Sequence, residues 1–243
     1  MNFDQLLEKL PRRFQNAAKF GVAKILEQPD VIGFVLAGSV AQGTSDEFSD
    51  LDFYVVTNGF ERWRGCWMLE GVPVEFFFNP HWFLAKQIEN DAAALHMLAT
   101  GIVMLSHPEL EKLQFQAREI LSRPPKARTE SELAFDRFNT MEWVLETRSV
   151  IGTNNYAYFV PHALNFILKA IYRKNRWWEV KAKHLLQDFE TRAPELTKLV
   201  FEVLNGSNQT TQQLALETLA REIIDPLEQI EYQSEKQMLQ PET

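Results

Sequence analysis

The sequence predicts an α+β protein, in which an N-terminal domain with a small sheet flanked by helices precedes an all-helical C-terminal bundle. Short apolar runs bounded by turn residues, at 31–37 and 72–78, are typical of buried strands. Beyond the segment 122–126, which contains Pro124 and Pro125, the apolar residues recur at helical spacing. We therefore place a domain boundary at this segment.

The N-terminal domain is expected to combine helices and strands. Pro11 interrupts the first helical pattern, because proline removes a backbone donor. A hairpin is expected around Glu70-Gly71, and Pro73 leaves its register open. The expected elements are a helix at 4–28, a strand at 31–37, a short helix after Ser39, strands at 51–57, 66–70 and 72–78, a helix from Pro80 to 99, a short strand at 101–106 and a helix at 109–121.

The C-terminal domain is expected to contain only helices, at 128–152, 157–175, 179–190, 194–204 and 209–232. The resulting domain boundaries are 1–122 for the first domain, 127–233 for the helical domain and 234–243 for a polar tail, which we expect to fray. Because domain interfaces are common ligand sites, we expect the binding cleft between the two domains.

Composition narrows the class of protein. The 243 residues carry a formal net charge of −8, which argues against a nonspecific nucleic-acid binder. The single cysteine, Cys66, excludes an internal disulfide framework, and its aromatic neighbours favour a packed thiol. The N-terminus has no signal-peptide pattern, and no apolar run reaches the length of a membrane span. We expect a cytoplasmic protein without membrane contact.

The most informative segment joins two of the expected strands. The first strand ends at Gly38-Ser39, where glycine permits a tight turn whose N–H groups, with the serine hydroxyl, suit a phosphate. Asp50 and Asp52 open the next strand and point to the same face, because strand side chains alternate. Two adjacent carboxylates repel each other, and Mg²⁺, which prefers hard oxygen ligands, would relieve the repulsion.

A third acid, Glu75, is the only charged residue in the apolar strand 72–78. A carboxylate in such a strand is costly unless something compensates it. Taken separately, a Gly-Ser turn is usually only a turn, and an Asp-x-Asp pair is often a solvated strand end. In combination, these features predict a phosphate-binding turn beside a metal site formed by Asp50, Asp52 and Glu75.

These residues resemble a known signature. Gly38-Ser39, Gly43, Ser49-Asp50-Leu51-Asp52 and the later Glu75 look like the signature of the DNA polymerase β-type nucleotidyltransferase superfamily. The resemblance covers roughly residues 30–80, and the size and helical second half are similar to the aminoglycoside and lincosamide (kanamycin-type) nucleotidyltransferases. It implies an N-terminal nucleotidyltransferase domain with a small mixed sheet, a two-ion Mg²⁺ site, and ATP or another NTP as co-substrate.

The same resemblance implies a role for each signature residue. Asp50 and Asp52 would bind metal, and Glu75 would bind the second metal or activate the acceptor hydroxyl. Gly38 and Ser39 would contact the terminal phosphates.

The helical half offers further candidates. The stretch 175–185 resembles one in antibiotic nucleotidyltransferases, where a lysine precedes an aromatic residue and a leucine. By that match Lys183 would bind the triphosphate, although His184 replaces the aromatic residue, and a solvated lysine is the alternative. Glu142 and Glu146, one helical turn apart, are candidates for a general base from the first helix of this domain. Surface glutamates without a role are the alternative there.

The predicted function is Mg-dependent transfer of a nucleoside monophosphate, AMP from ATP, to a hydroxyl of a small molecule such as an aminoglycoside-like antibiotic, with release of pyrophosphate. Two alternatives stay open: transfer of AMP to a protein, as in toxin–antitoxin nucleotidyltransferases, and a non-catalytic nucleotide-binding regulator. The expected partners are the NTP and the acceptor, without nucleic acid. The resemblance is compatible with a homodimer.

Overall fold

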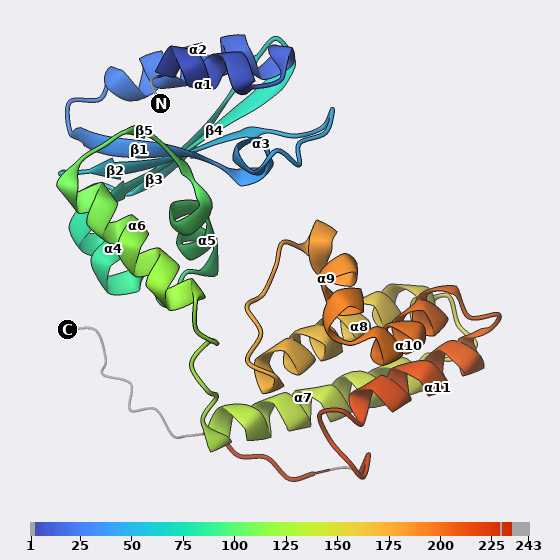
Figure 1. Cartoon of the computed structure of the whole chain (residues 1–243). Coiled ribbons are helices and arrows are strands. Elements are labelled where there is room, and N and C mark those ends of the chain that lie inside the picture. The colour runs from blue at the N-terminus through green and yellow to red at the C-terminus, as the bar shows by residue number, and fades with distance from the viewer. Residues whose placement is uncertain (1–2, 229, 235–243) are drawn as a thin grey trace, which may run out of the picture. The chain divides into compact units, whose positions relative to one another are not determined.

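The computed structural model describes residues 3–228 and 230–234 (Figure 1). The chain divides after Arg123 into two compact units. The first combines a sheet with helices, and in the second the regular elements of the described residues are helices. The fold class predicted from the sequence is therefore confirmed. The predicted polar tail, 234–243, lies outside the described residues except for Ser234.

The first unit is built on a five-stranded mixed sheet in the order β3-β4-β2-β1-β5. β2 and β4 run parallel, whereas the other neighbouring pairs are antiparallel. The strands are β1 (Val31–Ala37), β2 (Leu51–Thr57), β3 (Trp63–Leu69), β4 (Val72–Pro80) and β5 (Ile102–Leu105).

Helices cover both faces of this sheet (Figure 1). On one face, Phe14 of the second helix packs in a core with Phe34, Phe53 and Phe76 from three strands. Gly21 approaches so closely that an added Cβ would lie 2.3 Å from the Phe53 ring. The helices are α1 (Phe3–Lys9) and α2 (Arg12–Leu26) on this face, α4 (His81–Gln87), α5 (Ala92–Thr100) and α6 (Pro108–Leu121) on the other, and the short α3 (Gly38–Gln42) directly after β1.

A two-residue turn fixes the β3–β4 hairpin. Glu70 (φ 51°) and Gly71 (φ 77°) both have left-handed backbone, as a type I′ turn requires. The turn pairs Leu69 with Val72, and this register places Cys66 opposite Glu75.

Pro73 is tolerated in β4 because it lies one residue before the pairing with β2 begins at Val74. β3 is an edge strand, and Cys66 on it is exposed. The expectation of a packed thiol was therefore wrong.

The helix predicted from Pro80 to 99 is two helices, α4 and α5. The break occurs because Asp91 caps the second helix, its Oδ1 accepting from the backbone N–H of Ala94 at 3.0 Å. Aspartate favours such caps over helix interiors.

The second unit is a helical bundle. Its core contains Val144, Ile167, Tyr172, Phe189 and Leu216, each fully buried. The elements are α7 (Glu130–Ser149), α8 (Asn155–Lys174), the 3₁₀ helix η1 (Ala182–His184), α9 (Leu185–Arg192), α10 (Pro194–Asn205) and α11 (Gln209–Ala220).

Two helix predictions were wrong in this unit. The helix expected at 179–190 begins only at η1. After α8 the chain turns at Arg176, whose backbone is left-handed (φ 56°), the Trp177 N–H bonds back to the Tyr172 carbonyl, and residues 177–181 have no regular structure. The helix expected at 209–232 ends at Ala220. Residues 221–226 form turns and bends, and Pro226 disfavours helix only at the residue before it.

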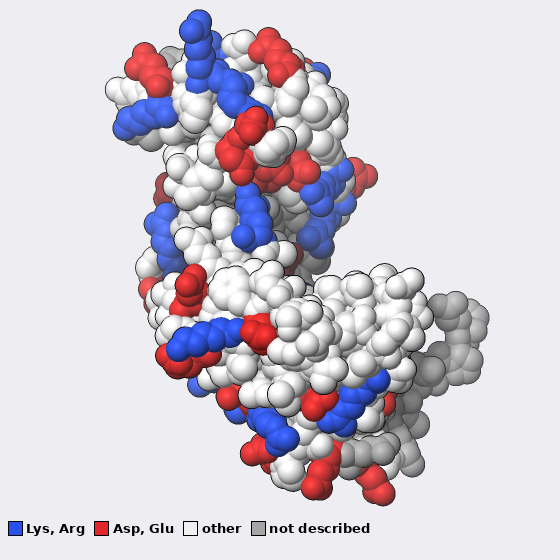
Figure 2. Space-filling view, turned by 90° about the vertical axis from the view of Figure 1, so that its right-hand side faces the viewer, with Lys and Arg blue, Asp and Glu red and all other residues white. Residues whose placement is uncertain are grey.

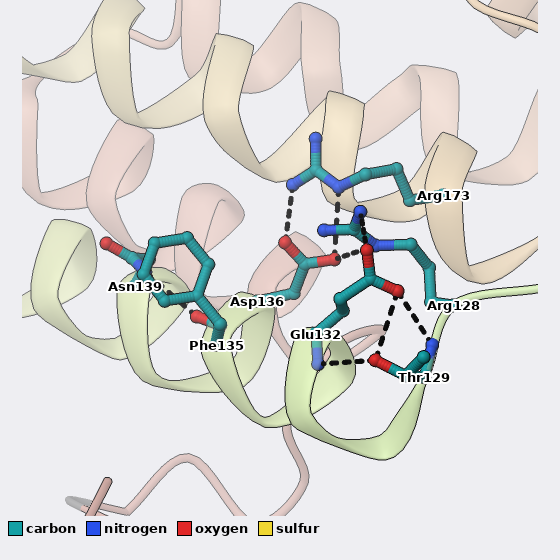
Figure 3. A network of polar contacts seen from close by, with 7 residues as sticks. All are labelled: Arg128, Thr129, Glu132, Phe135, Asp136, Asn139 and Arg173. Carbon is teal, nitrogen blue, oxygen red and sulfur yellow. Dashed lines mark hydrogen bonds and ion pairs between the residues drawn. The ribbon is translucent and has the colours of Figure 1, made fainter. Parts of the chain in front are cut away.

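An ion-pair network joins α7 to α8 (Figure 3). Asp136 on α7 is buried, and it accepts from Nη2 and Nε of Arg173 on α8 at 2.7 and 3.0 Å. At the start of α7, Thr129 and Glu132 form a capping box. The helix therefore begins at a well-defined residue. Over the described residues, no helix is long and apolar enough to span a bilayer.

Candidate active site

The sheet register brings three carboxylates together. The parallel pairing of β2 with β4 sets Asp52 directly beside Glu75, so both side chains leave the same face. Asp50 immediately precedes β2 and shares that face by alternation. One carboxylate oxygen from each of the three lies within 4.8 Å of the others. Asp52 is buried, whereas Asp50 and Glu75 are partly exposed.

This acidic triad fits a divalent cation. All three donors are carboxylate oxygens, which Mg²⁺ prefers, and Mg²⁺ normally takes only one or two protein carboxylates together with substrate phosphates. Oxygens bound to one Mg²⁺ lie about 3–4 Å apart, so small side-chain rotations close the observed separation.

Gly38 lies against the triad. Its backbone is left-handed (φ 72°), and an added Cβ would lie 2.0 Å from Oδ2 of Asp52. The neighbouring Ser39 is buried, and its carbonyl accepts from the Thr44 N–H at 2.9 Å where α3 ends. Glycine is therefore required at position 38 for two reasons, the turn and the space that Asp52 occupies.

The loop before β2 is held by its own side chains. Asp46 Oδ1 accepts from the Ser49 hydroxyl and from the Phe48 N–H, each at 2.9 Å. The Ser49 hydroxyl also accepts from the Asp46 N–H, and Ser49 is buried. These bonds fix the backbone immediately before Asp50.

Arg64 on β3 is a site residue that the sequence analysis missed. Its Nη2 donates to Oε2 of Glu75 at 2.5 Å, and its guanidinium lies 4.7 Å from the centre of the Phe77 ring. The bond to Glu75 raises the pKa of Arg64, so the guanidinium stays charged. The signal was available, since a two-residue turn at Glu70-Gly71 puts Arg64 on the face of Glu75.

Figure 2 looks onto the side of the first unit where α3 lies in Figure 1. Acidic side chains gather there, with basic side chains beside them. Such a mixture suits a site that binds a cation together with an anionic ligand.

The other predicted site residues lie in the second unit. Glu142 is exposed on α7, as is Glu146 one turn later, and Lys183 is exposed in η1. The triad and the Gly38–Ser39 turn belong to the first unit. The roles predicted for Glu142 and Lys183 stay predictions.

The mixed sheet, with its carboxylates beside a glycine–serine turn, defines a protein equipped to bind a metal and a phosphate. Residues 21–150 match the nucleotidyltransferase domain family, and the chain belongs to that family. The protein is accordingly a nucleotidyltransferase, and the resemblance to the polymerase β-type superfamily is confirmed. The closer resemblance to kanamycin-type enzymes stays a prediction.

One solved structure similar to this chain is a nucleotidyltransferase-like protein from Exiguobacterium sibiricum 255-15. The similarity covers 85% of this chain and 74% of that chain, with a TM-score of 0.49 and 15% sequence identity. No curated protein matches the chain at a significant level.

Proposed function

We propose that the protein transfers AMP from ATP to a hydroxyl of a small molecule and releases pyrophosphate. The observation that carries this proposal is the convergence of Asp50, Asp52 and Glu75 beside the Gly38–Ser39 turn. A binding module does not need three converging carboxylates, whereas an enzyme that catalyses nucleotidyl transfer uses them to hold metal ions. The kanamycin-type resemblance supports an aminoglycoside-like antibiotic as one class of acceptor.

The triad would hold one or two Mg²⁺ ions. When bound, such ions neutralise charge on the triphosphate and on the entering and leaving oxygens. Asp52 and Asp50 provide the ligands on β2, and Glu75 provides the ligand on β4.

The remaining residues position and neutralise the reactants. Gly38 and Ser39 bind the terminal phosphates of ATP. The acceptor oxygen forms a bond to the α-phosphorus, and the bond from that phosphorus to the bridging oxygen of the β-phosphate breaks. Pyrophosphate leaves, and the hydroxyl proton passes to the carboxylate of Glu75.

Pyrophosphate release from ATP, CTP, GTP and UTP, measured with a panel of hydroxylated acceptors, tests the proposal. We expect Mg²⁺-dependent release with ATP. Asp52→Asn should lower it by about three orders of magnitude, because metal binding supplies several kcal/mol of transition-state stabilisation. The control is Asp30→Asn, an exposed aspartate before β1, which should retain full activity.

Unchanged turnover in Asp52→Asn would refute the proposed site. Absence of both Mg·ATP binding and turnover with any acceptor would refute the function. Incorporation of labelled AMP into a protein of a cell lysate would instead favour a protein acceptor.

A further inference from the structure

A cavity of about 360 Å³ adjoins the acidic triad in the first unit. It is lined by Tyr54, two residues beyond Asp52 on β2, and by Phe77, two residues beyond Glu75 on β4. Two strand residues span about 7 Å, and residues two apart share a face. Arg64 lines the cavity and also bonds to Glu75, so the cavity and the triad have one side chain in common.

Tyr54, which lines this cavity, has a hydroxyl without a hydrogen-bond partner among the described residues. Tyr54 is 3% exposed. A buried polar atom without a partner costs free energy, and native structures contain few of them. A phenol hydroxyl can donate one hydrogen bond, so Tyr54 offers a donor to an acceptor oxygen.

The charged side chains add further donors. Arg62 Nε donates to Oδ1 of Asn79 at 2.8 Å, and Arg62 Nη2 donates to Oδ2 of Asp91 at 3.4 Å. The other oxygen of Asp91 caps α5. The side-chain acceptors of Asn79 and Asp91 are thus engaged, whereas each guanidinium has five N–H donors. Arg62, Arg64 and Tyr54 therefore present an excess of donors, which suits a ligand with acceptor oxygens.

The walls of the cavity suit a flat ligand. The rings of Tyr54 and Phe77 stack with centroids 6.1 Å apart and an interplanar angle of 19°. On the side of α5 the lining is apolar, formed by Ala93, Ala94 and Met97. The volume lies in the lower part of the range of small-molecule sites.

We propose that this cavity binds the acceptor, and that the acceptor is a small flat molecule with a carboxylate or carbonyl oxygen for Tyr54 and Arg62. The strand order β1-β2-β4-β3 sets the triad between the turn after β1 and Arg64 on β3. The nucleotide phosphates and the acceptor hydroxyl can then reach the triad from different sides.

The identification of the ligand as an acceptor rests on the proposed function, whereas binding in the cavity is measured without turnover. Three probes share a ring and a hydroxyl and differ in charge: 4-hydroxybenzoate, its methyl ester and 4-hydroxybenzylamine. Their affinities for the full chain are measured by titration calorimetry or saturation-transfer NMR. We expect the benzoate to bind at least about tenfold more tightly than the amine, because only the benzoate pairs with arginine.

Two variants test the residues. Tyr54→Phe should weaken benzoate binding about three- to tenfold without lowering the melting temperature, because the hydroxyl has no hydrogen-bond partner to lose among the described residues. Arg62→Gln should weaken it about tenfold or more. Arg12→Gln is the control, since Arg12 is exposed on α2, on the other face of the sheet.

Equal binding of the benzoate and the amine, no binding of any probe, or unchanged binding in Tyr54→Phe and Arg62→Gln would each overturn the inference. A melting temperature lowered by Tyr54→Phe with binding intact would assign the hydroxyl to the fold instead. If the probes bind as expected but pyrophosphate is never released, the proposed function fails and the cavity remains a ligand site.

Discussion

At the scale of single residues, the site depends on close contacts between the carboxylates and their neighbours. Asp52 is buried beside a glycine whose position no side chain can share, and Glu75 is held by Arg64 across the hairpin. A metal ligand fixed by its neighbours needs little reorganisation when a cation arrives. The restricted setting of Asp52 and Glu75 therefore favours the cation binding that we propose for this site.

Gly38→Ala is expected to damage the site more than the fold. The substitution places Cβ where Oδ2 of Asp52 lies and forces alanine into left-handed backbone, which costs about 1–2 kcal/mol. Pyrophosphate release should fall about a hundredfold or more, because a displacement of about 1 Å at a reacting centre costs that much. Chemical unfolding and the turnover assay measure the two effects.

Gly152→Ala is the matched control. Gly152 is also left-handed (φ 83°), but an added Cβ meets nothing within 4 Å. The Gly152→Ala variant should lose about as much stability as Gly38→Ala but keep its activity. Equal activities of the two variants would show that contact with Asp52 is irrelevant.

The site residues that could be predicted from the sequence are those that lie in a recognisable local sequence pattern. Asp50 and Asp52 follow a glycine–serine turn, and Glu75 is conspicuous in an apolar strand. Arg64 was missed because its position depends on the register of the hairpin. The cavity at Tyr54 was missed because it requires α5 to pack on the sheet. Tertiary packing of this kind leaves no local pattern to find.

At the scale of elements, most helices and strands were predictable, and the errors share a cause. The helices expected through residues 88–91 and beyond Ala220 continue an apolar pattern past residues that stop helices locally. The cap formed by Asp91 outweighed the periodic pattern in the first case, and turns and bends at residues 221–226 replace the helix in the second. Local backbone chemistry therefore decides where these helices end.

An ion pair between two helices of the second unit predicts how the stability of the protein depends on pH. Arg148 on α7 pairs with Glu217 on α11 at 2.6 Å, and this pairing lowers the pKa of Glu217 below its usual 4.5. A lowered carboxyl pKa contributes stability that is present above the unfolded pKa and is lost as the pH falls through the folded pKa.

Glu217→Gln should accordingly lower the free energy of unfolding by up to about 1 kcal/mol near neutral pH, since the pair is partly exposed. The difference from the unmodified protein should shrink as the pH falls below about 4. Denaturant unfolding of both proteins at several pH values measures this difference in the free energy of unfolding. Glu195→Gln, from the exposed pair with Lys198, is the control. A difference that grows on acidification would contradict the assigned pairing.

At the scale of the whole molecule, two compact units are joined by a segment without regular structure, residues 122–129. Such segments are preferred sites of proteolysis. Trypsin should cut first at Lys126, which is exposed, because Arg123 precedes a proline and resists cleavage.

Limited digestion followed by mass spectrometry should therefore give fragments that meet at 126–127. Lys126→Gln should slow this cleavage, whereas Lys112→Gln, an exposed lysine within α6, should not. First cleavage inside α7 or α8 would show that the second unit opens more readily than the linker.

The position of β3 at the sheet edge has a consequence for how such a protein can diversify. Asp52 and Glu75 are set side by side by β2 and β4, and β3 takes no part in that pairing. Changes in the sequence of β3 would alter Arg64, and thus the proposed ligand preference, while the backbone register that sets Asp52 beside Glu75 is kept. The fold thus separates the two strands that pair Asp52 with Glu75 from an edge strand whose sequence can vary.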